Sequence, residues 1–425
     1  MRKWFILVVV LLTTWSTFSV VLADHQGNRG KHKGHHKKQE EFKLGVEVLL
    51  DDKKELLEGK RIGLITNPTG VDQDLNSVVD LFYEDEDLEL TALYGPEHGV
   101  RGSAQAGEYV EFYEDEKTGL PVYSLYGKTK KPTPDMLENI DVLVFDIQDV
   151  GTRFYTYIYT MAYAMEAAQE NDIPFFVLDR PNPIGGDQVE GPVLDTDYQS
   201  FVGNYPIPLR HGMTAGELAK LFNKEFDIGA ELTVVKMEGW KRGMDYDDTD
   251  MPFVAPSPNM PTVDTAYVYP GAALIEGTNV SEGRGTTKPF ELIGAPFIDS
   301  EQLAEAMNEK NLPGVRFRAA SFTPSFSKHA GKLSHGVQLH ILDRDEFQPV
   351  NTGLHLVKTI HDMYPDDFEF RAEDANGISF FDLLIGNGWV RESINEGHSV
   401  EQMEKRWKDD LKKFNKTRKH FLLYK

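Results

Sequence analysis

The chain has 425 residues, no cysteine and a formal net charge of −23. The lack of cysteine excludes disulfides, thiol catalysis and zinc-thiolate sites. Beyond residue 41, 38 Lys and Arg stand against 65 Asp and Glu, a net charge of −27, which argues against nucleic acid as a partner. The remaining 384 residues exceed the usual size of a single core, so we expect two domains.

The N-terminus has the pattern of a secretory signal peptide. Arg2 and Lys3 precede an apolar run that continues to Leu22, and Ala23 is a small residue suited to cleavage. An uncleaved membrane anchor is the alternative, because the run approaches the length of a bilayer crossing. We therefore expect a signal peptide over residues 1–23 and a secreted protein, extracellular or associated with the cell wall.

Residues 24–41 are basic and rich in histidine, with almost no apolar side chain. Such a segment buries too little surface to offset the entropy of ordering, which predicts a disordered spacer. His25, His32, His35 and His36 could bind a transition metal. The basic composition favours instead a solvated tail that adheres to anionic wall polymers.

The first half of the remaining chain alternates short apolar runs with amphipathic segments. This pattern is typical of βαβ units around a mainly parallel sheet, and it predicts a Rossmann-like α/β domain over residues 42–228. We expect its strands at Arg61–Thr66, Leu88–Tyr94, Val122–Tyr126, Val142–Ile147 and Phe175–Asp179. Helical patterns fall at Asn76–Glu84, Pro134–Glu138 and Tyr155–Glu170.

Polar loops follow four of these strands. Ligands bind outside the carboxyl ends of the strands in an open parallel sheet, so the loops are expected to face one crevice. Turn chemistry alone accounts for their glycines and prolines, but not for the amide, acidic and basic side chains that gather there. The candidate site residues at this edge are Asn67, Glu97, His98, Asp146, Gln148, Arg153, Tyr155, Tyr157 and Arg180.

A later turn adds one more candidate. Thr214 and Glu217 have the spacing of a capping box, which predicts the start of a helix. His211 precedes this box and is not explained by capping, so we include it among the candidate site residues.

The second half has a mixed pattern, which predicts a smaller α+β domain over residues 229–425. Its strands are expected at Leu232–Lys236, Val315–Ala319, Gly336–Ile341 and Ser379–Leu384, and its helices at Ser300–Lys310, Thr352–Tyr364 and Val400–Phe414. A long span without clear periodicity, Trp240–Phe297, separates the first strand from the first helix. Irregular spans of this length in compact domains are often functional loops.

Within that span, residues 276–286 concentrate charge and glycine. Glu276, Glu282 and Arg284 lie there with Asn279 and three glycines, which let the backbone approach a ligand closely. The arginine can clamp a carboxylate in bidentate fashion. A flexible acidic loop with internal ion pairs is the alternative.

These residue types suit hydrolysis of a glycosidic bond. That reaction needs a carboxylic acid to protonate the leaving oxygen and usually a second carboxylate as nucleophile or base. Glu97 from the first domain, with Glu282 or Glu276 from the second, would meet this need in an interdomain cleft. No Gly-x-Gly-x-x-Gly follows the first strand, so we expect no nucleotide cofactor. We also expect no metal, although His98, Asp146 and His211 form an alternative ligand set.

Five blocks of the sequence are distinctive in composition and order: Asn67–Gly70, Gly95–Gly99, Asp146–Tyr157, Asp179–Pro183 and Glu276–Thr286. Together these blocks resemble the NamZ family of exo-β-N-acetylmuramidases. The match extends over nearly all of the chain after the spacer.

The resemblance implies an enzyme that releases N-acetylmuramic acid from the non-reducing end of peptidoglycan-derived saccharides. It also implies a site between a Rossmann-like domain and a second domain, and work beside an exo-N-acetylglucosaminidase and an amidase. The lactyl carboxylate of this sugar requires a local cation, and Arg153, Arg180 and Arg284 are the candidates.

The chemical mechanism stays open at this stage. The sequence does not separate retention from inversion of the anomeric carbon, or either from attack by the substrate's own 2-acetamido group. Two other classes of protein remain as alternatives: a non-catalytic module that binds wall glycan, and a metal-dependent wall amidase or esterase.

Overall fold

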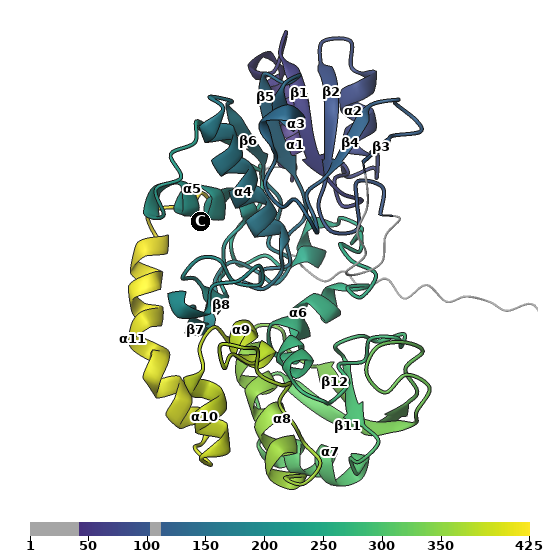
Figure 1. Ribbon diagram of the computed structural model, residues 1–425, viewed down its shortest axis with the longest axis vertical. Helices are drawn as coiled ribbons and strands as arrows, with labels where there is room; N and C mark the ends of the chain where they lie inside the picture. The colour runs from purple at the N-terminus through teal and green to yellow at the C-terminus, as the bar shows by residue number, and fades with distance from the viewer. Residues whose placement is uncertain (1–41, 103–111) are drawn as a thin grey trace, which may run out of the picture. The chain divides into compact units, whose positions relative to one another are not determined.

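The computed structural model describes residues 42–102 and 112–425 (Figure 1). The expected signal peptide and spacer, residues 1–41, lie outside the described residues. Within the part of the chain that is described, no helix combines the length and apolar character needed to cross a membrane.

A seven-stranded, mainly parallel sheet forms the centre of the first half. Its strand order is β3-β4-β2-β1-β5-β6-β9, and β1 pairs in parallel with both β2 and β5. Only the short β3 runs antiparallel within this sheet. The order confirms the predicted α/β fold class. The strands are β1 (Arg61–Thr66), β2 (Glu89–Gly95), β3 (Tyr113–Glu114), β4 (Pro121–Ser124), β5 (Val142–Asp146), β6 (Phe175–Leu178) and β9 (Leu232–Val235).

The central strands are buried almost throughout, as expected for a parallel sheet with helices on its faces. Among the described residues, five α-helices belong to this part of the fold. They are α1 (Gly45–Asp52), α2 (Val78–Glu84), α3 (Pro134–Leu137), α4 (Tyr157–Glu170) and α5 (Ala215–Glu225). The predicted capping box of Thr214 and Glu217 is confirmed at the start of α5.

The edge strand β9 corrects one expectation. We expected Leu232–Lys236 to open the smaller domain, but β9 pairs in parallel with β6 and completes the large sheet. A strand of four residues carries no information about which sheet it joins, because its partner Phe175–Leu178 lies more than fifty residues earlier in the chain.

The smaller sheet has three antiparallel strands in the order β10-β12-β11. This confirms a second, smaller sheet with helices, and it belongs to the same compact unit as the large one. Its strands are β10 (Leu292–Ala295), β11 (Val315–Phe322) and β12 (Ser334–Ile341). Its helices include α7 (Ser300–Glu309) and α8 (Pro349–Met363).

The prediction of a strand at Ser379–Leu384 was wrong. This segment forms α9 (Phe380–Ile385), because Ser379 caps its first turn and Asp382 completes a capping box. The apolar run suggested a buried strand, but hydrogen bonds from the two capping side chains stabilise the first turn of a helix. Two further helices follow, α10 (Trp389–Asn395) and α11 (Val400–Arg418).

The span Trp240–Phe297 is less irregular than we expected. It contains the helix α6 (Val263–Ala272) and, near its end, the strand β10. The helix is buried on all sides and includes Pro270, so it lacks the amphipathic period that identifies a helix in a sequence. Two short strands before this span, β7 (Glu190–Val193) and β8 (Pro208–Arg210), form a separate pair.

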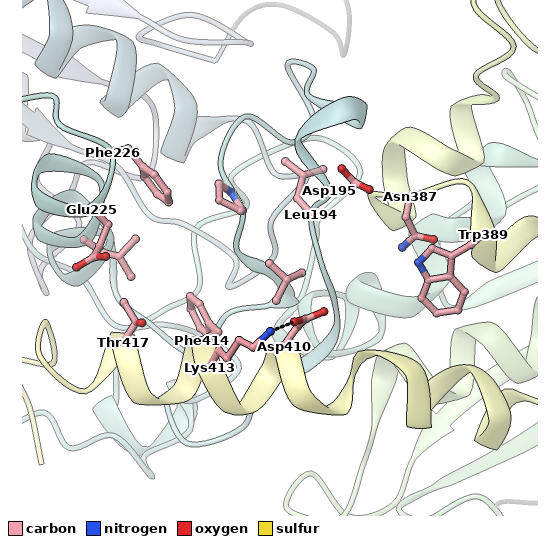
Figure 2. A pocket seen from close by; sticks show the side chains of 13 residues that line it. Leu194, Asp195, Glu225, Phe226, Asn387, Trp389, Asp410, Lys413, Phe414 and Thr417 are labelled. Carbon is pink, nitrogen blue, oxygen red and sulfur yellow. Dashed lines mark hydrogen bonds and ion pairs between the residues drawn. The ribbon is translucent and has the colours of Figure 1, made fainter.

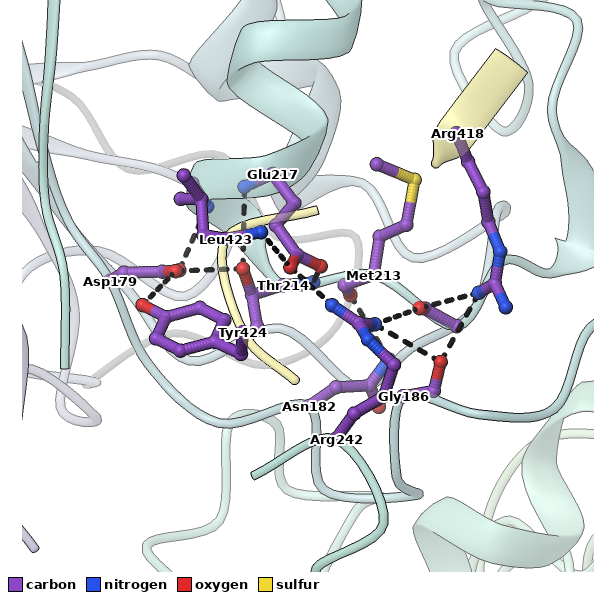
Figure 3. Close-up of polar contacts among 12 residues, drawn as sticks. Asp179, Asn182, Gly186, Met213, Thr214, Glu217, Arg242, Arg418, Leu423 and Tyr424 are labelled. Atoms are coloured by element: carbon purple, nitrogen blue, oxygen red, sulfur yellow. Dashed lines mark hydrogen bonds and ion pairs between the residues drawn. The ribbon is translucent and has the colours of Figure 1, made fainter. Parts of the chain in front are cut away.

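The last residues of the chain return to the large sheet (Figure 3). The Tyr424 hydroxyl donates to Asp179 Oδ2 at 2.7 Å, and the Leu423 amide donates to Glu217 Oε1 at 2.8 Å. Arg242 forms an ion pair with Glu217. These contacts join the C-terminus to the carboxyl end of β6 and to the start of α5.

Candidate active site

A tight turn presents Glu97 at the carboxyl end of β2. The Gly99 amide donates to the Pro96 carbonyl at 3.0 Å, and His98 adopts a left-handed φ of 76°. Such a φ is costly for a residue with a side chain, and strained positions of this kind concentrate at functional sites. Gly95 allows this close approach of the backbone, because a Cβ on it would lie 3.0 Å from Gly99 Cα and would make a tight contact.

Glu97 lines a pocket of about 70 Å³ to which distant segments contribute. The turn after β2 supplies two side chains, the segment that leads into α4 supplies four, and three come from beyond residue 250. The pocket therefore brings Glu97 together with Arg284, as the sequence suggested. The lining residues are Glu97, His98, Phe154, Tyr155, Thr156, Tyr157, Ser257, Tyr269 and Arg284.

Tyrosines form one wall of this pocket. The ring centroids of Tyr155 and Tyr157 lie 4.9 Å apart, and those of Tyr155 and Tyr269 lie 5.8 Å apart. Burial raises the pKa of all three hydroxyls, and the negative charge of Glu97 adds to the rise. The tyrosines therefore stay protonated. The Tyr157 hydroxyl donates to the Pro256 carbonyl, whereas the buried Tyr155 hydroxyl makes no hydrogen bond to the described residues and can donate one to a ligand. A fourth tyrosine, Tyr126, has its pKa raised to about 12 by burial and by its contact with Glu97.

Arg284 is held by two carboxylates. Its Nη2 lies 3.3 Å from Glu276 Oε2, and its Nε lies 3.4 Å from Glu282 Oε1. Lys328 Nζ lies 2.9 Å from Glu282 Oε2 and donates to the carbonyls of Ile275 and Thr278. The guanidinium is thus fixed in orientation while one side of it reaches the pocket.

This charge cluster, defined as Glu276, Glu282, Arg284 and Lys328, is neutral when all four groups are ionised. Burial raises the pKa of Glu276 and lowers that of Lys328. Only Arg284 among the four lines the pocket; Glu282 is almost fully buried behind it. The carboxylate of Glu282 is therefore placed to orient Arg284.

Three other predicted residues are buried at the carboxyl edge of the large sheet. Asn67 accepts hydrogen bonds from Thr69, Gln148 donates to the carbonyls of Asp149 and Pro181, and His211 Nδ1 accepts from the Met213 amide. Each of the three keeps one buried polar atom without a hydrogen bond to the described residues: Asn67 Nδ2, Gln148 Oε1 and His211 Nε2. Buried polar atoms are usually paired, so these mark a polar region behind the pocket.

The other two candidate arginines do not reach the pocket. Arg153 is fully buried and donates to the carbonyls of Pro192, Ile207 and Leu384. Arg180 is buried in a bidentate pair with Asp146. Both arginines follow strands, as the sequence indicated, but their guanidinium groups point into the protein and bind its own acceptors. The expectation that either could face the lactyl carboxylate does not fit this arrangement.

The Asn279 side chain does not line the pocket and instead connects two loops. Its side chain donates to the Asp367 carbonyl at 2.7 Å and accepts from the Glu369 amide at 3.1 Å. It thereby ties the loop that carries Glu276, Glu282 and Arg284 to the segment after α8.

Sequence reasoning missed Tyr269, Ser257 and Lys328. Tyr269 belongs to the helix that the sequence did not reveal, and Lys328 lies in a loop more than forty residues after Glu282. Neither had a local motif to identify it. Ser257 lies in the span Trp240–Phe297, whose expected role as a functional loop was the one sequence feature that could have indicated this residue.

The alternative metal site does not assemble. Across the described ranges, no group of three or more His, Asp or Glu side chains has the geometry to hold a metal ion. Asp146, one of the three proposed ligands, has both carboxylate oxygens on Arg180.

A larger pocket, of about 460 Å³, lies elsewhere and is shown in Figure 2. It is lined by residues of α5, α11 and the segment around Trp389. The Lys413–Asp410 pair at its rim joins two residues of the same helix turn. It contains none of the candidate site residues, so size alone does not identify the site.

Two family models match the chain in succession. The N-terminal model of exo-β-N-acetylmuramidase NamZ matches residues 62–264, and the C-terminal model matches residues 267–424. The peptidoglycan β-N-acetylmuramidase NamZ of Bacillus subtilis (strain 168) is 66% identical over 387 residues, which cover 91% of this chain and 92% of that protein.

Two crystal structures of DUF1343 family proteins from Bacteroides fragilis are similar to this structure. One has a TM-score of 0.83 at 43% identity and covers 90% of this chain and 99% of its own. The other has a TM-score of 0.73 at 35% identity and covers 91% of this chain and 99% of its own. With both halves matched in order, this chain belongs to the exo-β-N-acetylmuramidase NamZ family.

Proposed function

We propose that this protein is an exo-β-N-acetylmuramidase that hydrolyses the terminal non-reducing N-acetylmuramic acid from peptidoglycan fragments. The observation that carries the proposal is the pocket that joins Glu97 to Arg284 among tyrosine hydroxyls. Membership of the NamZ family and the activity in the name of the Bacillus subtilis relative support the same substrate.

Glu97 is the proton donor in this proposal. Departure of the glycosidic oxygen requires a carboxylic acid within hydrogen-bond reach. Among the described residues that line the pocket, Glu97 is the one carboxyl group. Its partly exposed side chain beside Tyr126, on the turn that contains the strained His98, supports this role.

The group that attacks the anomeric carbon is the second part of the mechanism. Glu282 is a candidate by residue type, but its contacts with Lys328 and Arg284 favour a positioning role. Attack by the 2-acetamido group of the substrate needs one protein acid and a group that polarises the acetamide, and the Tyr155 hydroxyl in the pocket is a candidate for the second role. This arrangement of the pocket favours the substrate-assisted route.

Arg284 is the partner for the lactyl carboxylate in this proposal. A guanidinium held in place by carboxylates binds a further carboxylate with little loss of side-chain entropy.

Export and wall association complete the proposal. The basic residues Arg2 and Lys3, the apolar run and Ala23 support cleavage of a signal peptide, and the spacer composition supports contact with anionic wall polymers. Action beside an exo-N-acetylglucosaminidase and an amidase follows from the resemblance to the family. N-terminal sequencing of the protein from culture medium tests the export: a start at Asp24 is expected, and an intact Met1 would contradict it.

The decisive experiment measures release of N-acetylmuramic acid from a chromogenic β-N-acetylmuraminide and from wall fragments, with and without chelator. The Glu97→Gln variant is expected to lose at least about a hundredfold in kcat, because one general acid contributes about 10²–10⁴-fold. The exposed Glu138→Gln variant is the matched control and should keep full activity.

Three outcomes would overturn parts of the proposal. Binding of glycan without release by the wild type would indicate a non-catalytic module. Chelator-sensitive cleavage of amide or ester bonds in the wall fragments, without release of N-acetylmuramic acid, would indicate a metal-dependent amidase or esterase. Full activity of folded Glu97→Gln would remove Glu97 as the acid. For Glu282→Gln, a raised KM with kcat preserved supports the positioning role, whereas loss of kcat alone supports direct participation.

A further inference from the structure

A second cavity, of about 650 Å³, adjoins the pocket at Glu97. Two stretches of chain pass from one to the other. Ser257 and Arg284 line the smaller pocket, and their successors Pro258 and Gly285 line the larger cavity. At about 70 Å³ the smaller pocket lies below the range of about 300–1,000 Å³ that ligand sites usually have. A bound saccharide must therefore extend beyond it.

The lining of this second cavity is polar but uncharged. Among the described residues that form it, none has an ionisable side chain. Hydroxyl and amide groups alternate with apolar surface from Phe322 and Phe326. Phe326 is 50% exposed, which is unusual for a large aromatic ring with no covering element. A neutral ligand with hydroxyl groups on its edges and an apolar face suits this combination.

The loop that carries Phe326 is fixed to the loop that carries Arg284. The Ser325 amide and hydroxyl donate to the Gly285 carbonyl at 2.8 and 2.9 Å. Gly285 has a φ of 79°, and a Cβ on it would lie 2.7 Å from the backbone of Phe326. The two backbones are therefore in direct contact, so the ring of Phe326 has a defined position relative to Arg284.

We propose that this second cavity binds the neutral N-acetylhexosamine that follows the scissile bond, with the ring of Phe326 against the apolar face of that sugar. The inference rests on the proposed function. In a peptidoglycan strand, the sugar after N-acetylmuramic acid is N-acetylglucosamine, which carries neither the lactyl carboxylate nor a peptide. The pocket contains the cationic Arg284 and the adjoining cavity only uncharged groups, which matches the alternation of an anionic and a neutral sugar along the strand.

The test compares two substrates that differ only in the leaving group. One is the disaccharide of N-acetylmuramic acid and N-acetylglucosamine; the other is methyl β-N-acetylmuraminide, whose methyl group is too small to reach Phe326. For Phe326→Ala, kcat/KM on the disaccharide is expected to fall at least about fivefold, from loss of the apolar contact, with a change under about twofold on the methyl glycoside. Phe326→Tyr should restore most of the loss.

Binding gives a second readout that does not depend on turnover of the disaccharide. N,N′-diacetylchitobiose is expected to inhibit hydrolysis of the methyl glycoside, and its inhibition constant should rise at least about fivefold in Phe326→Ala. Leu342→Ala is the matched control, because Leu342 is 66% exposed and follows the opposite end of β12 from the Phe326 loop.

The failure of this inference is distinct from failure of the proposed function. Equal losses on both substrates, or unchanged kcat/KM on the disaccharide, would overturn the second cavity as a sugar site while release of N-acetylmuramic acid by the wild type stands. No release from either substrate by the wild type would instead overturn the proposed function.

Discussion

Arg284 is the residue on which substrate selection depends in this structure. It is the one cationic side chain among the described residues that line the pocket, and it takes its orientation from Glu276 and Glu282. Its guanidinium also lies over the ring of Phe290, with 5.1 Å between Cζ and the ring centroid. The side chain is therefore ordered before any ligand arrives.

Removing this side chain is expected to change which sugar the enzyme prefers. Arg284→Ala should lower kcat/KM on a β-N-acetylmuraminide about tenfold or more relative to the matching β-N-acetylglucosaminide, because a charge-assisted hydrogen bond contributes about 1.5–3 kcal/mol. Kinetics on the two chromogenic glycosides measure the ratio. Arg318→Ala, at an exposed position of β11, is the control. Equal losses on both sugars would show that Arg284 does not read the lactyl group.

The sequence identified three candidate arginines, two after strands of the large sheet and one in the loop of residues 276–286, but could not choose among them. A residue that follows a strand is placed by the strand, whereas the direction of its side chain depends on remote partners. Arg153 donates to the carbonyl of Leu384, 231 residues away, and Arg180 donates to that of Val71. Such remote partners have no local sequence signature. The sequence therefore could not predict that only Arg284, of the three arginines, lines the pocket.

At the scale of elements, the crossing of α6 and α8 supports the tyrosine wall. A Cβ on Gly271 would lie 1.8 Å from the Pro349 carbonyl oxygen, and one on Gly353 would lie 2.3 Å from the Gly271 carbonyl oxygen. The two helices therefore meet backbone to backbone. Because Tyr269 lies two residues before this contact, the crossing also fixes one wall of the pocket.

An added methyl group at this crossing is expected to disturb both stability and the site. Gly271→Ala should lower the free energy of unfolding by about 1–3 kcal/mol, the usual cost of overpacking. Chemical denaturation measures the loss, and a raised KM would report the shift of Tyr269. Gly243→Ala is the control, since its Cβ would meet only the side-chain oxygen of Asp187, at 3.0 Å. Equal free energies of unfolding and equal KM values for the two variants would contradict a tight crossing of α6 and α8.

Elements with strong periodicity were predictable, and those set by tertiary contacts were not. The large sheet was anticipated because its buried strands form apolar runs bounded by turns. The helix α6 was not predicted because nearly all of its residues are buried, so its sequence has no amphipathic period. The segment of α9 was predicted as a strand because its run of apolar residues outweighed the capping pair of Ser379 and Asp382. In both cases the deciding interactions lie outside the hydrophobic pattern.

At the scale of the whole molecule, Asp179 joins the C-terminus to the large sheet. Its Oδ2 accepts from Tyr424 and Thr214, each at 2.7 Å, and its Oδ1 accepts from the Gly216 amide at 2.8 Å (Figure 3). Burial nevertheless raises the pKa of Asp179 to about 6, from an ordinary value of 3.8. The desolvation of this carboxylate exceeds the effect of its hydrogen bonds.

This raised pKa makes stability depend on pH in a defined direction. Between about pH 4 and 6 the folded state binds a proton at Asp179 that the unfolded state has released, so stability falls as pH rises through this window. The shift of about two units corresponds to roughly 3 kcal/mol as an upper bound. Asp179→Asn removes this titration, because its side chain stays neutral at every pH.

The difference in unfolding free energy between Asp179→Asn and the wild type isolates this effect from other titrating groups. Urea denaturation at pH 4, 5, 6 and 7 should give a difference that shifts in favour of the variant as pH rises to about 6 and then stays constant. Asp197→Asn, at an exposed position, provides the comparison for loss of a surface carboxylate. A difference that does not change with pH would mean that Asp179 is ionised in the folded state throughout, with the hydrogen bonds from Tyr424 and Thr214 offsetting its burial.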